Sequence, residues 1–236
     1  MIRKISLLLF TLLLFVACKQ NETVKDYVTL SGTISNTLET DLVLNGPGYL
    51  RQIKLDDKGK FKDTMKVEEG FYMLTYGDIK AFMFLKNSYD LNLNLNTQDP
   101  IGSLAFSGLG AGTNNYMAEK IRFEQKENLN DFNGFFSLDK PKFEQKVAGL
   151  QRSMKDLLDN AVDLDSTFLD RELQSNEQFI KFLSSNYESQ HEMLTVLGRG
   201  QPSPKFTFPN VNGKNISLDD LKGTYVYVDV WATWCG

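Results

Sequence analysis

The sequence predicts a mixed fold in three parts: an antiparallel β-sandwich, a helical connector and the incomplete start of an α/β domain. Short apolar runs separated by turn residues fill residues 26–112, and apolar residues at helical spacing follow in 113–197. A single alternating apolar run then lies within 198–236. With 236 residues, of which 42% are hydrophobic, the chain has enough apolar material for a substantial core.

Residues 1–18 have the layout of an export signal. Arg3 and Lys4 give a basic start, and the apolar stretch 5–17 is short for a membrane-spanning helix. Ala17 directly precedes Cys18, so this site resembles a lipobox, at which a signal peptidase cuts after the cysteine has been acylated; Phe15 stands where leucine is usual. We therefore expect a lipoprotein that is held on a membrane by acyl chains on Cys18.

Two other interpretations of this segment stay open: an ordinary secreted protein with an incidental cysteine, and an uncleaved anchor. Lys19, rather than aspartate, follows Cys18. Under the sorting rule of some Gram-negative bacteria, this favours the outer membrane. We expect a periplasm-facing position in the cell envelope.

The β-sandwich is expected over residues 26–112. Turn residues separate eight short runs with the alternation or apolar character of strands: Val28–Ile34, Asp41–Leu44, Arg51–Leu55, Gly59–Lys62, Phe71–Tyr76, Ala81–Leu85, Asp90–Asn96 and Ser103–Phe106. In the run 90–96, three leucines alternate with asparagines, which predicts a strand with one buried face and one solvent-exposed face.

Aromatic residues are concentrated in two of these runs. We expect Phe71, Tyr72, Tyr76, Phe82 and Phe84 to lie in the sandwich core. The alternative is a surface row among them that binds a partner or a glycan.

The helical connector is expected over residues 113–197. Thr113 or Asn114 is the predicted N-cap of a first helix. A second helix is expected after Pro141, with apolar residues three or four positions apart. Further helical turns are expected over 165–173 and 176–197, ended by Gly198.

Three local patterns resemble binding motifs only superficially. Gly108-x-Gly-x-Gly112 lacks the spacing of a nucleotide loop and is expected to be a strand-to-helix turn. His191-Glu192 begins like a zinc-protease motif, but Thr195 occupies the second histidine position and the chain has one histidine. The acidic pairs 56–57 and 68–69 are expected at solvated hairpin ends. We expect no metal and no cofactor.

The charge balance argues against nucleic acid as a partner. The formal net charge is −4, with 26 basic and 30 acidic residues. No basic stripe is present to displace phosphate counterions.

The most informative stretch is the last one, residues 198–236. It contains Gly200-Gln-Pro-Ser-Pro-Lys-Phe, then Asn212-Gly-Lys-Asn-Ile-Ser-Leu, then Asp219-Asp-Leu-Lys-Gly, then the apolar run 225–230 and finally Trp231-Ala-Thr-Trp-Cys-Gly236. In this order the pieces resemble the start of the thioredoxin-like domain of bacterial membrane-tethered thiol-disulfide oxidoreductases of the TlpA/ResA type. Residues 27–116 also resemble the small β domain of unassigned function that precedes such domains in Bacteroidetes-type lipoproteins.

The resemblance implies roles for three residues of the motif. Cys235 would be the nucleophilic cysteine that follows a core strand, and Trp231 and Trp234 would shape and shield its thiol. The partners would be disulfides of client proteins or an upstream membrane reductant, with no nucleic acid. A peroxiredoxin-like peroxide reductase, which would use the same cysteine, is the alternative within this class, and a non-enzymatic envelope lipoprotein that binds a protein or glycan through its β domain is the alternative outside it.

No second cysteine follows Cys235 in this chain. A resolving thiol is what releases a mixed disulfide. Because the 236-residue chain contains only the first part of the active-site motif, we expect it to lack turnover. We also expect residues 201–236 to leave apolar strands uncovered.

Overall fold

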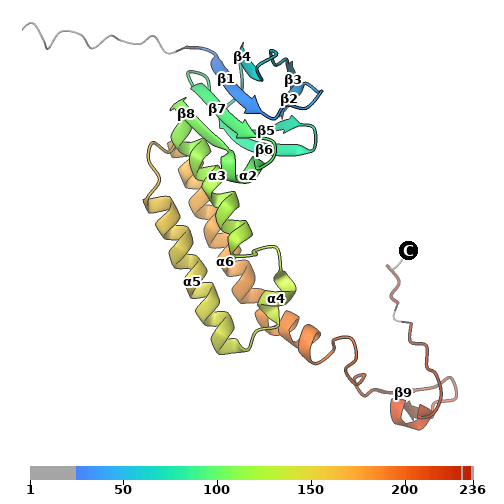
Figure 1. Cartoon of the computed structure of the whole chain (residues 1–236). Helices are drawn as coiled ribbons and strands as arrows, with labels where there is room; N and C mark the ends of the chain where they lie inside the picture. The colour runs from blue at the N-terminus through green and yellow to red at the C-terminus, as the bar shows by residue number, and fades with distance from the viewer. Residues whose placement is uncertain (1–24, 230, 235–236) are drawn as a thin grey trace, which may run out of the picture. The chain divides into compact units, whose positions relative to one another are not determined.

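The computed structural model describes residues 25–229 and 231–234 (Figure 1). The export signal, Cys18 and Cys235 therefore lie outside the described residues. The chain forms two compact units. Unit 1 comprises the residues up to Asn130 and Gln151–Glu177, and unit 2 comprises Asp131–Leu150 and Gln178–Gly236.

Eight strands precede the long helices, as predicted, and the short helices over 100–103 and 132–136 were not predicted. The strands of unit 1 are β1 (Val28–Ser35), β2 (Leu42–Gly46), β3 (Tyr49–Ile53), β4 (Lys60–Met65), β5 (Gly70–Tyr76), β6 (Ile79–Leu85), β7 (Asp90–Asn96) and β8 (Ala105–Leu109). The helices are α2 (Pro100–Ser103), α3 (Ala111–Lys126), α4 (Phe132–Phe136), α5 (Lys140–Asp159) and α6 (Ser166–Thr195). The short strands β9 (Thr207–Pro209) and β10 (Asn215–Ser217) and the 3-10 helix η2 (Leu218–Leu221) follow.

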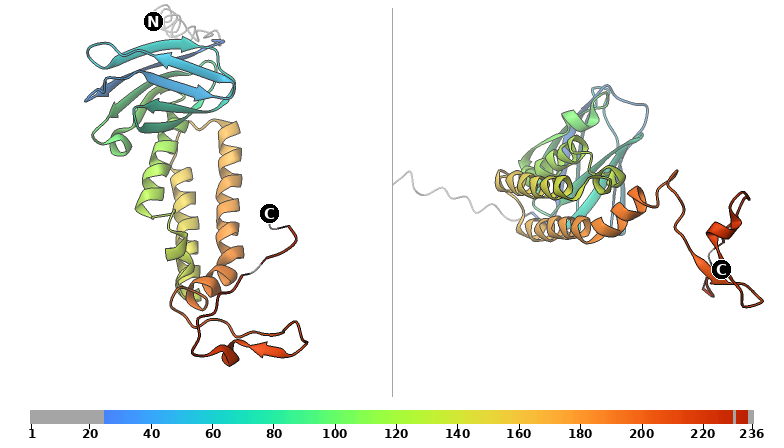
Figure 2. Two further views of the ribbon diagram at one scale, coloured as in Figure 1. Left: turned by 90° about the vertical axis from the view of Figure 1, so that its right-hand side faces the viewer. Right: turned by 90° about the horizontal axis from the view of Figure 1, so that it is seen from below.

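Unit 1 is built on two four-stranded sheets, so the predicted β-sandwich is confirmed. One sheet has the order β4-β1-β7-β8 and the other β3-β2-β5-β6. The two sheets stack face to face, as the left view of Figure 2 shows. One pair departs from the antiparallel prediction: β1 and β7 run parallel, with Leu30 beside Leu91 and Ile34 beside Leu95. Strands far apart in sequence form this pair, which a hairpin pattern does not reveal.

The alternation on β7 places its leucines in the space between the sheets. Leu91 and Leu93 are fully buried and Leu95 is nearly so, whereas Asn94 is exposed. Side chains of successive strand residues point to opposite faces, which explains why this run could be assigned from sequence.

The sheet that contains β5 and β6 is covered on both faces, and this changes the placement of the aromatic residues. Tyr72 and Tyr76 are buried, as predicted for the sandwich core. Phe71 and Phe84 are cross-strand partners, and so share the opposite face. There the Phe84 ring contacts Phe168 of α6 at a centroid distance of 5.7 Å. The prediction that all five aromatics lie between the sheets was therefore wrong for this face.

Helix α3 closes one edge of each sheet through two neighbouring asparagines. Asn114 accepts from the backbone N–H of Phe84 (2.9 Å) and donates to its carbonyl (3.0 Å), so its amide pairs with edge strand β6 as another strand would. Asn115 bonds both backbone groups of Phe106 on edge strand β8 in the same way, at 2.8 Å each. These contacts satisfy strand-edge groups that would otherwise be unpaired.

The predicted N-cap of this helix was therefore wrong. The helix begins at Ala111, with Gly110 as N-cap in the left-handed region. Thr113 and Asn114 are buried inside the first turns. Thr113 accepts a hydrogen bond from the backbone N–H of Asp165 (2.9 Å). Thr113 thus bonds to the segment before α6. Asn114 bonds to β6, and its amide also donates to the carbonyl of Gly110, the N-cap residue, at 3.0 Å.

We expect Asn114→Ala to lower the free energy of unfolding by about 3 kcal/mol, because it leaves a buried backbone donor and acceptor unpaired. Urea unfolding followed by circular dichroism measures this loss. The matched control is Asn94→Ala, the same change at an exposed position on β7, for which we expect less than about 0.5 kcal/mol. Equal losses in the two variants would contradict the edge-pairing role.

Helix α6 is one continuous helix, whereas the sequence suggested two. No glycine or proline occurs between its first and last residues, so nothing in the backbone interrupts it. Asp165 caps its start by accepting from the backbone N–H groups of Thr167 (2.9 Å) and Phe168 (3.2 Å), and it also pairs with Lys86 (3.0 Å). Burial alone would raise the pKa of Asp165, but these hydrogen bonds hold it below its ordinary value.

In unit 2, aromatic side chains pack between helices. Phe136 and Phe143 are buried, and the Phe143 ring stacks on Tyr187 with centroids 4.1 Å apart. The hydroxyl of Tyr187 donates to the carbonyl of Leu138 (2.9 Å). This small core holds the start of α5 against the second half of α6.

Candidate functional site

The segment expected to carry the redox motif begins with a short hairpin in unit 2. Strands β9 and β10 pair antiparallel, with Phe208 opposite Ile216. Asn210 forms the turn, because its side-chain oxygen accepts from the backbone N–H groups of Asn212 and Lys214, each at 3.0 Å. Gly213 follows with φ of +77°, a conformation that favours glycine. The turn of this hairpin is therefore stabilised locally, by the Asn210 side chain and the conformation of Gly213.

A capping box links the hairpin to helix η2. The Asp220 carboxylate accepts from the Ser217 hydroxyl (2.8 Å) and from the Ser217 backbone N–H (2.9 Å). The bond from this backbone N–H is the larger cause that lowers the pKa of Asp220. Leu218 donates its N–H to the carbonyl of Phe206, 3.1 Å away, which joins the two sides of the segment.

The apolar run after Gly223 does not form the predicted strand over its described residues, 225–229. Tyr225 and Tyr227 are fully or almost fully exposed, and Val228 is more than half exposed. A strand requires a neighbour that accepts and donates its backbone hydrogen bonds, and none of the described strands pairs with this run. These exposed side chains agree with the expectation of uncovered apolar residues in 201–236.

Of the predicted site residues, the structure describes the two tryptophans but not the two cysteines. Trp231 and Trp234 are exposed, at 74% and 85% of their surface. Cys235, which they were expected to shield, lies outside the described residues, as does the lipidation candidate Cys18. No helix among the residues described here is long and apolar enough to cross a membrane.

The glycine-rich stretch between β8 and α3 is a strand-to-helix turn, as predicted. Gly108 and Gly110 both have positive φ, at +91° and +93°. A Cβ on Gly108 would lie 2.1 Å from the carbonyl oxygen of Asp90, and one on Gly110 would lie 2.3 Å from the Tyr89 ring. Close packing and backbone conformation therefore account for these glycines without a phosphate ligand.

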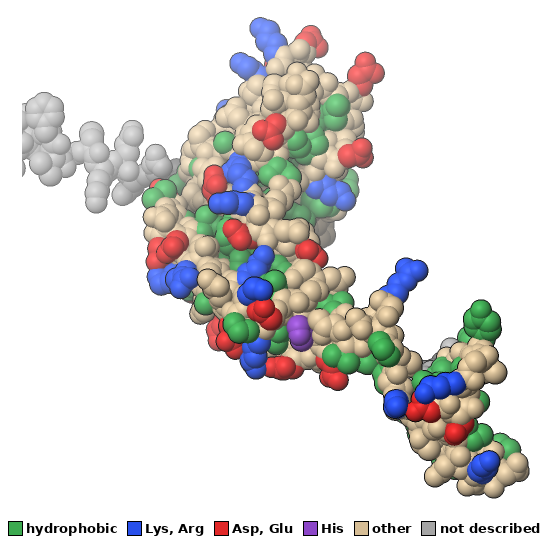
Figure 3. Space-filling view, turned by 60° about the horizontal axis from the view of Figure 1, so that its bottom comes forward, with side chains coloured by type: hydrophobic (Ala, Val, Ile, Leu, Met, Phe, Trp, Pro, Cys, Tyr) green, Lys and Arg blue, Asp and Glu red, His purple; other side chains and the backbone are tan. Residues whose placement is uncertain are grey.

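The remaining motif candidates have structural roles. The Nδ1 atom of His191 lies 2.8 Å from the carbonyl oxygen of Phe136, and its ring stacks on Tyr187. Asp56 stabilises a hairpin turn by accepting from the backbone N–H groups of Lys58 and Lys60. No group of three potential metal ligands occurs among residues 25–229 and 231–234. On the face shown in Figure 3, side chains of both charge signs are interspersed.

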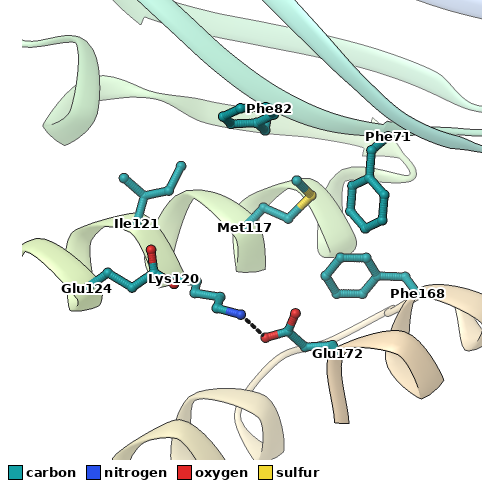
Figure 4. Close-up of a pocket in the computed structure, with 8 residues that line it drawn as sticks. All are labelled: Phe71, Phe82, Met117, Lys120, Ile121, Glu124, Phe168 and Glu172. Carbon is teal, nitrogen blue, oxygen red and sulfur yellow. Dashed lines mark hydrogen bonds and ion pairs between the residues drawn. The ribbon is translucent and has the colours of Figure 1, made fainter. Parts of the chain in front are cut away.

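Unit 1 contains a pocket that was not predicted from the sequence, although two of its aromatic residues were noted there. Its volume is about 350 Å³, within the range of small-molecule sites. Phe71 and Phe82 line it from the sheet. The helical side is lined by Met117, Lys120, Ile121 and Glu124 of α3 and by Phe168 and Glu172 of α6 (Figure 4).

The polar groups of this pocket meet on its helical side. Lys120 Nζ lies 2.5 Å from Glu172 Oε1, and the Tyr116 hydroxyl donates to the same oxygen at 2.8 Å. The Glu172 side chain is 9% exposed and Lys120 22%. Burial raises the pKa of Tyr116, and its bond to Glu172 raises it further. Burial also raises the pKa of Glu124.

The sequence contained one usable signal for this pocket. Phe71 and Phe82 each adjoin residues that face the sandwich core, so the strand period places both on the other face. They are 42% and 51% exposed. The helical residues gave no such signal, because charges on a helix are usually solvated.

Comparison with curated proteins finds similarity over part of the chain. Thiol-disulfide oxidoreductase ResA of Bacillus subtilis is 44% identical over 39 residues, which is 16% of this chain and 22% of that protein. Thioredoxin-like protein YneN of the same species is 35% identical over 49 residues, 21% of this chain and 29% of that protein. Thiol:disulfide interchange protein DsbE of Pseudomonas fluorescens is 49% identical over 37 residues, 15% of this chain and 21% of that protein.

The chain thus spans less than a third of the length of these relatives. No family model matches the chain. No solved structure matches it either. Over part of its length, the chain is similar to thioredoxin-like thiol-disulfide oxidoreductases.

Proposed function

We propose that this chain belongs to a membrane-anchored thiol-disulfide oxidoreductase of the cell envelope and that Cys235 is its nucleophile. The observation that carries the proposal is the order of motifs in 198–236, which ends in Trp231-Ala-Thr-Trp-Cys-Gly236. The partial similarity to ResA, over 39 residues, supports the proposal.

The chemistry proposed for Cys235 is thiol-disulfide exchange. Its thiolate attacks one sulfur of a client disulfide, a new S–S bond forms, the old one breaks, and the other client sulfur leaves as a thiolate. Trp231 and Trp234 would shape the surface around the thiol. Resolution of the mixed disulfide needs a second thiol, which no residue of this chain supplies once Cys18 is acylated.

The first step can be tested with this chain. In a Cys18→Ser background, Cys235 is the one thiol of the protein. We expect incubation with oxidised glutathione to add one glutathionyl group, and Cys18→Ser/Cys235→Ser to add none. The mixed disulfide should accumulate, and insulin reduction should show no turnover. Intact-protein mass spectrometry and an insulin turbidity assay measure the two results. Turnover by the single-thiol chain would contradict the assigned roles.

The membrane anchor is a separate part of the proposal. We propose that Cys18 is acylated and holds the protein on the periplasmic side of the envelope, at the outer membrane. We expect Cys18→Ser to move the protein from the membrane to the soluble fraction or to leave the signal uncleaved. Labelling of the wild-type chain with radioactive palmitate checks the modification directly, and lack of incorporation would contradict it.

A second candidate function is supported by the pocket of unit 1, which lies outside the redox segment. In that case the β domain with its covering helices binds a ligand, and residues 198–236 do not take part. Removal of 201–236 should then leave ligand capture unchanged.

A further inference from the structure

We propose that the pocket of unit 1 binds a small organic cation, namely an aromatic or other apolar body that carries one protonated amine. This site is independent of the redox chemistry proposed for Cys235. All of its lining residues belong to unit 1.

The pocket has an apolar part that suits the body of such a ligand. Phe71 and Phe168 approach one another with centroids 6.0 Å apart, and Met117 lies beside them (Figure 4). Phe82 is half exposed on the same sheet face. Exposed aromatic rings around a hollow are costly in water and favour an apolar ligand, and their faces also attract a cation.

The charges of the pocket do not balance. It contains two carboxylates, from Glu124 and Glu172, and one ammonium group, from Lys120. Lys120 is paired with Glu172, whose bonded oxygen also accepts from Tyr116. The pocket therefore has one carboxylate in excess of its ammonium groups.

That carboxylate belongs to Glu124. Among the residues that the structure describes, none forms a hydrogen bond or ion pair with the Glu124 side chain, although it is partly buried. Lys120, one turn earlier on α3, attracts this carboxylate only from beyond hydrogen-bond distance. Figure 4 shows it at the end of the pocket away from Phe71 and Phe168. A ligand ammonium would supply the missing partner, and a charge-assisted hydrogen bond of this type is among the stronger polar contacts.

The same imbalance argues against other ligand classes. An anion would be repelled by Glu124, and Lys120 is already engaged. A fully apolar molecule would bury Glu124 without a partner, which is unfavourable. A ligand with both an aromatic body and an amine satisfies both ends of the pocket.

Three probes with one indole ring test this selection: tryptamine, its alcohol analogue tryptophol and the anion indole-3-propionate. We expect tryptamine to bind at least about tenfold more tightly than either analogue, because it alone has the ammonium group. Titrations followed by NMR chemical shifts of the full chain give the dissociation constants and show which residues are affected. The shifts should be centred on residues of α3, β5 and β6 that line the pocket.

Two variants and a matched control assign the contacts. Glu124→Gln should weaken tryptamine binding about tenfold and leave tryptophol binding unchanged. Glu177→Gln makes the same chemical change at an exposed position of α6 and should change neither. Phe82→Ala should weaken all three probes. Thermal unfolding of each variant establishes that it remains folded.

Several results would overturn the proposal. They are the absence of tryptamine binding at millimolar concentration, equal affinity for tryptamine and tryptophol, tighter binding of indole-3-propionate, or unchanged tryptamine binding in folded Glu124→Gln. None of these results would bear on the reactivity of Cys235, so the two proposals fail or stand separately.

Discussion

Replacement of Phe84 by alanine is expected to lower the free energy of unfolding by about 4 kcal/mol. Phe84 is fully buried between the sheet and the helices that cover it. Its ring meets Phe71 at a centroid distance of 5.6 Å and Phe168 at 5.7 Å, both nearly edge to face. The substitution removes the apolar burial and these ring contacts and leaves a cavity.

The urea midpoint measured by circular dichroism gives this loss, with an unchanged slope if only stability is affected. Phe82→Ala is the matched control, because Phe82 lies two residues earlier on β6 and on the same face but is half exposed. We expect a loss of about 1 kcal/mol for Phe82→Ala. Similar losses in the two variants would contradict a tightly packed second core between the sheet and α3 and α6.

Most strands of unit 1 were predictable because they have a local pattern of their own, whereas β3 (Tyr49–Ile53) and β8 (Ala105–Leu109) are shifted by about two residues from the runs 51–55 and 103–106. The leucine and asparagine alternation on β7 places one set of side chains inward whatever the strand pairs with. Turn residues with positive φ, such as Gly59 and Gly77, mark where β4 and β6 begin. The pairing of strands was less predictable than their positions. The parallel pair of β1 with β7 joins residues about sixty positions apart, and no local signal encodes it.

Two of the errors share one physical cause, namely tertiary contacts that reassign polar or aromatic residues. Asn114 is a good N-cap residue in isolation, yet here it pairs with the edge of β6. Phe71 and Phe84 look like sandwich core by composition, but the helices cover the face on which they lie. The composition of a strand identifies apolar residues that must be buried, but it does not indicate which sheet or helix packs against them.

The two candidate sites differ in how far they could be predicted from sequence. The redox motif is contiguous, so its residues could be proposed from sequence, and even the hairpin and capping box before it follow from Asn210 and Asp220. The pocket brings together residues from β5, β6, α3 and α6 that are up to a hundred positions apart. The pairing of Lys120 with Glu172 could not be foreseen, because it depends on how α3 and the start of α6 pack.

A thioredoxin-like origin of residues 198–236 predicts that they can replace the equivalent stretch of a working enzyme. Bacillus subtilis ResA, which matches this chain over 39 residues, provides the recipient. In such a chimera, Cys235 would attack the substrate disulfide, and the thiol expected in the recipient's part would release the product. The run 225–230 would gain neighbouring strands and cover for its exposed tyrosines.

Insulin reduction by this chimera is the most direct test of the central claim. We expect turnover within about tenfold of that of unmodified ResA. Cys235→Ser should reduce it to background, since loss of a catalytic nucleophile lowers kcat by roughly several orders of magnitude. Thermal unfolding establishes that the chimera and its variant are equally folded. A folded chimera without activity, or a Cys235→Ser variant that retains the full rate, would contradict the assignment of this segment and of Cys235.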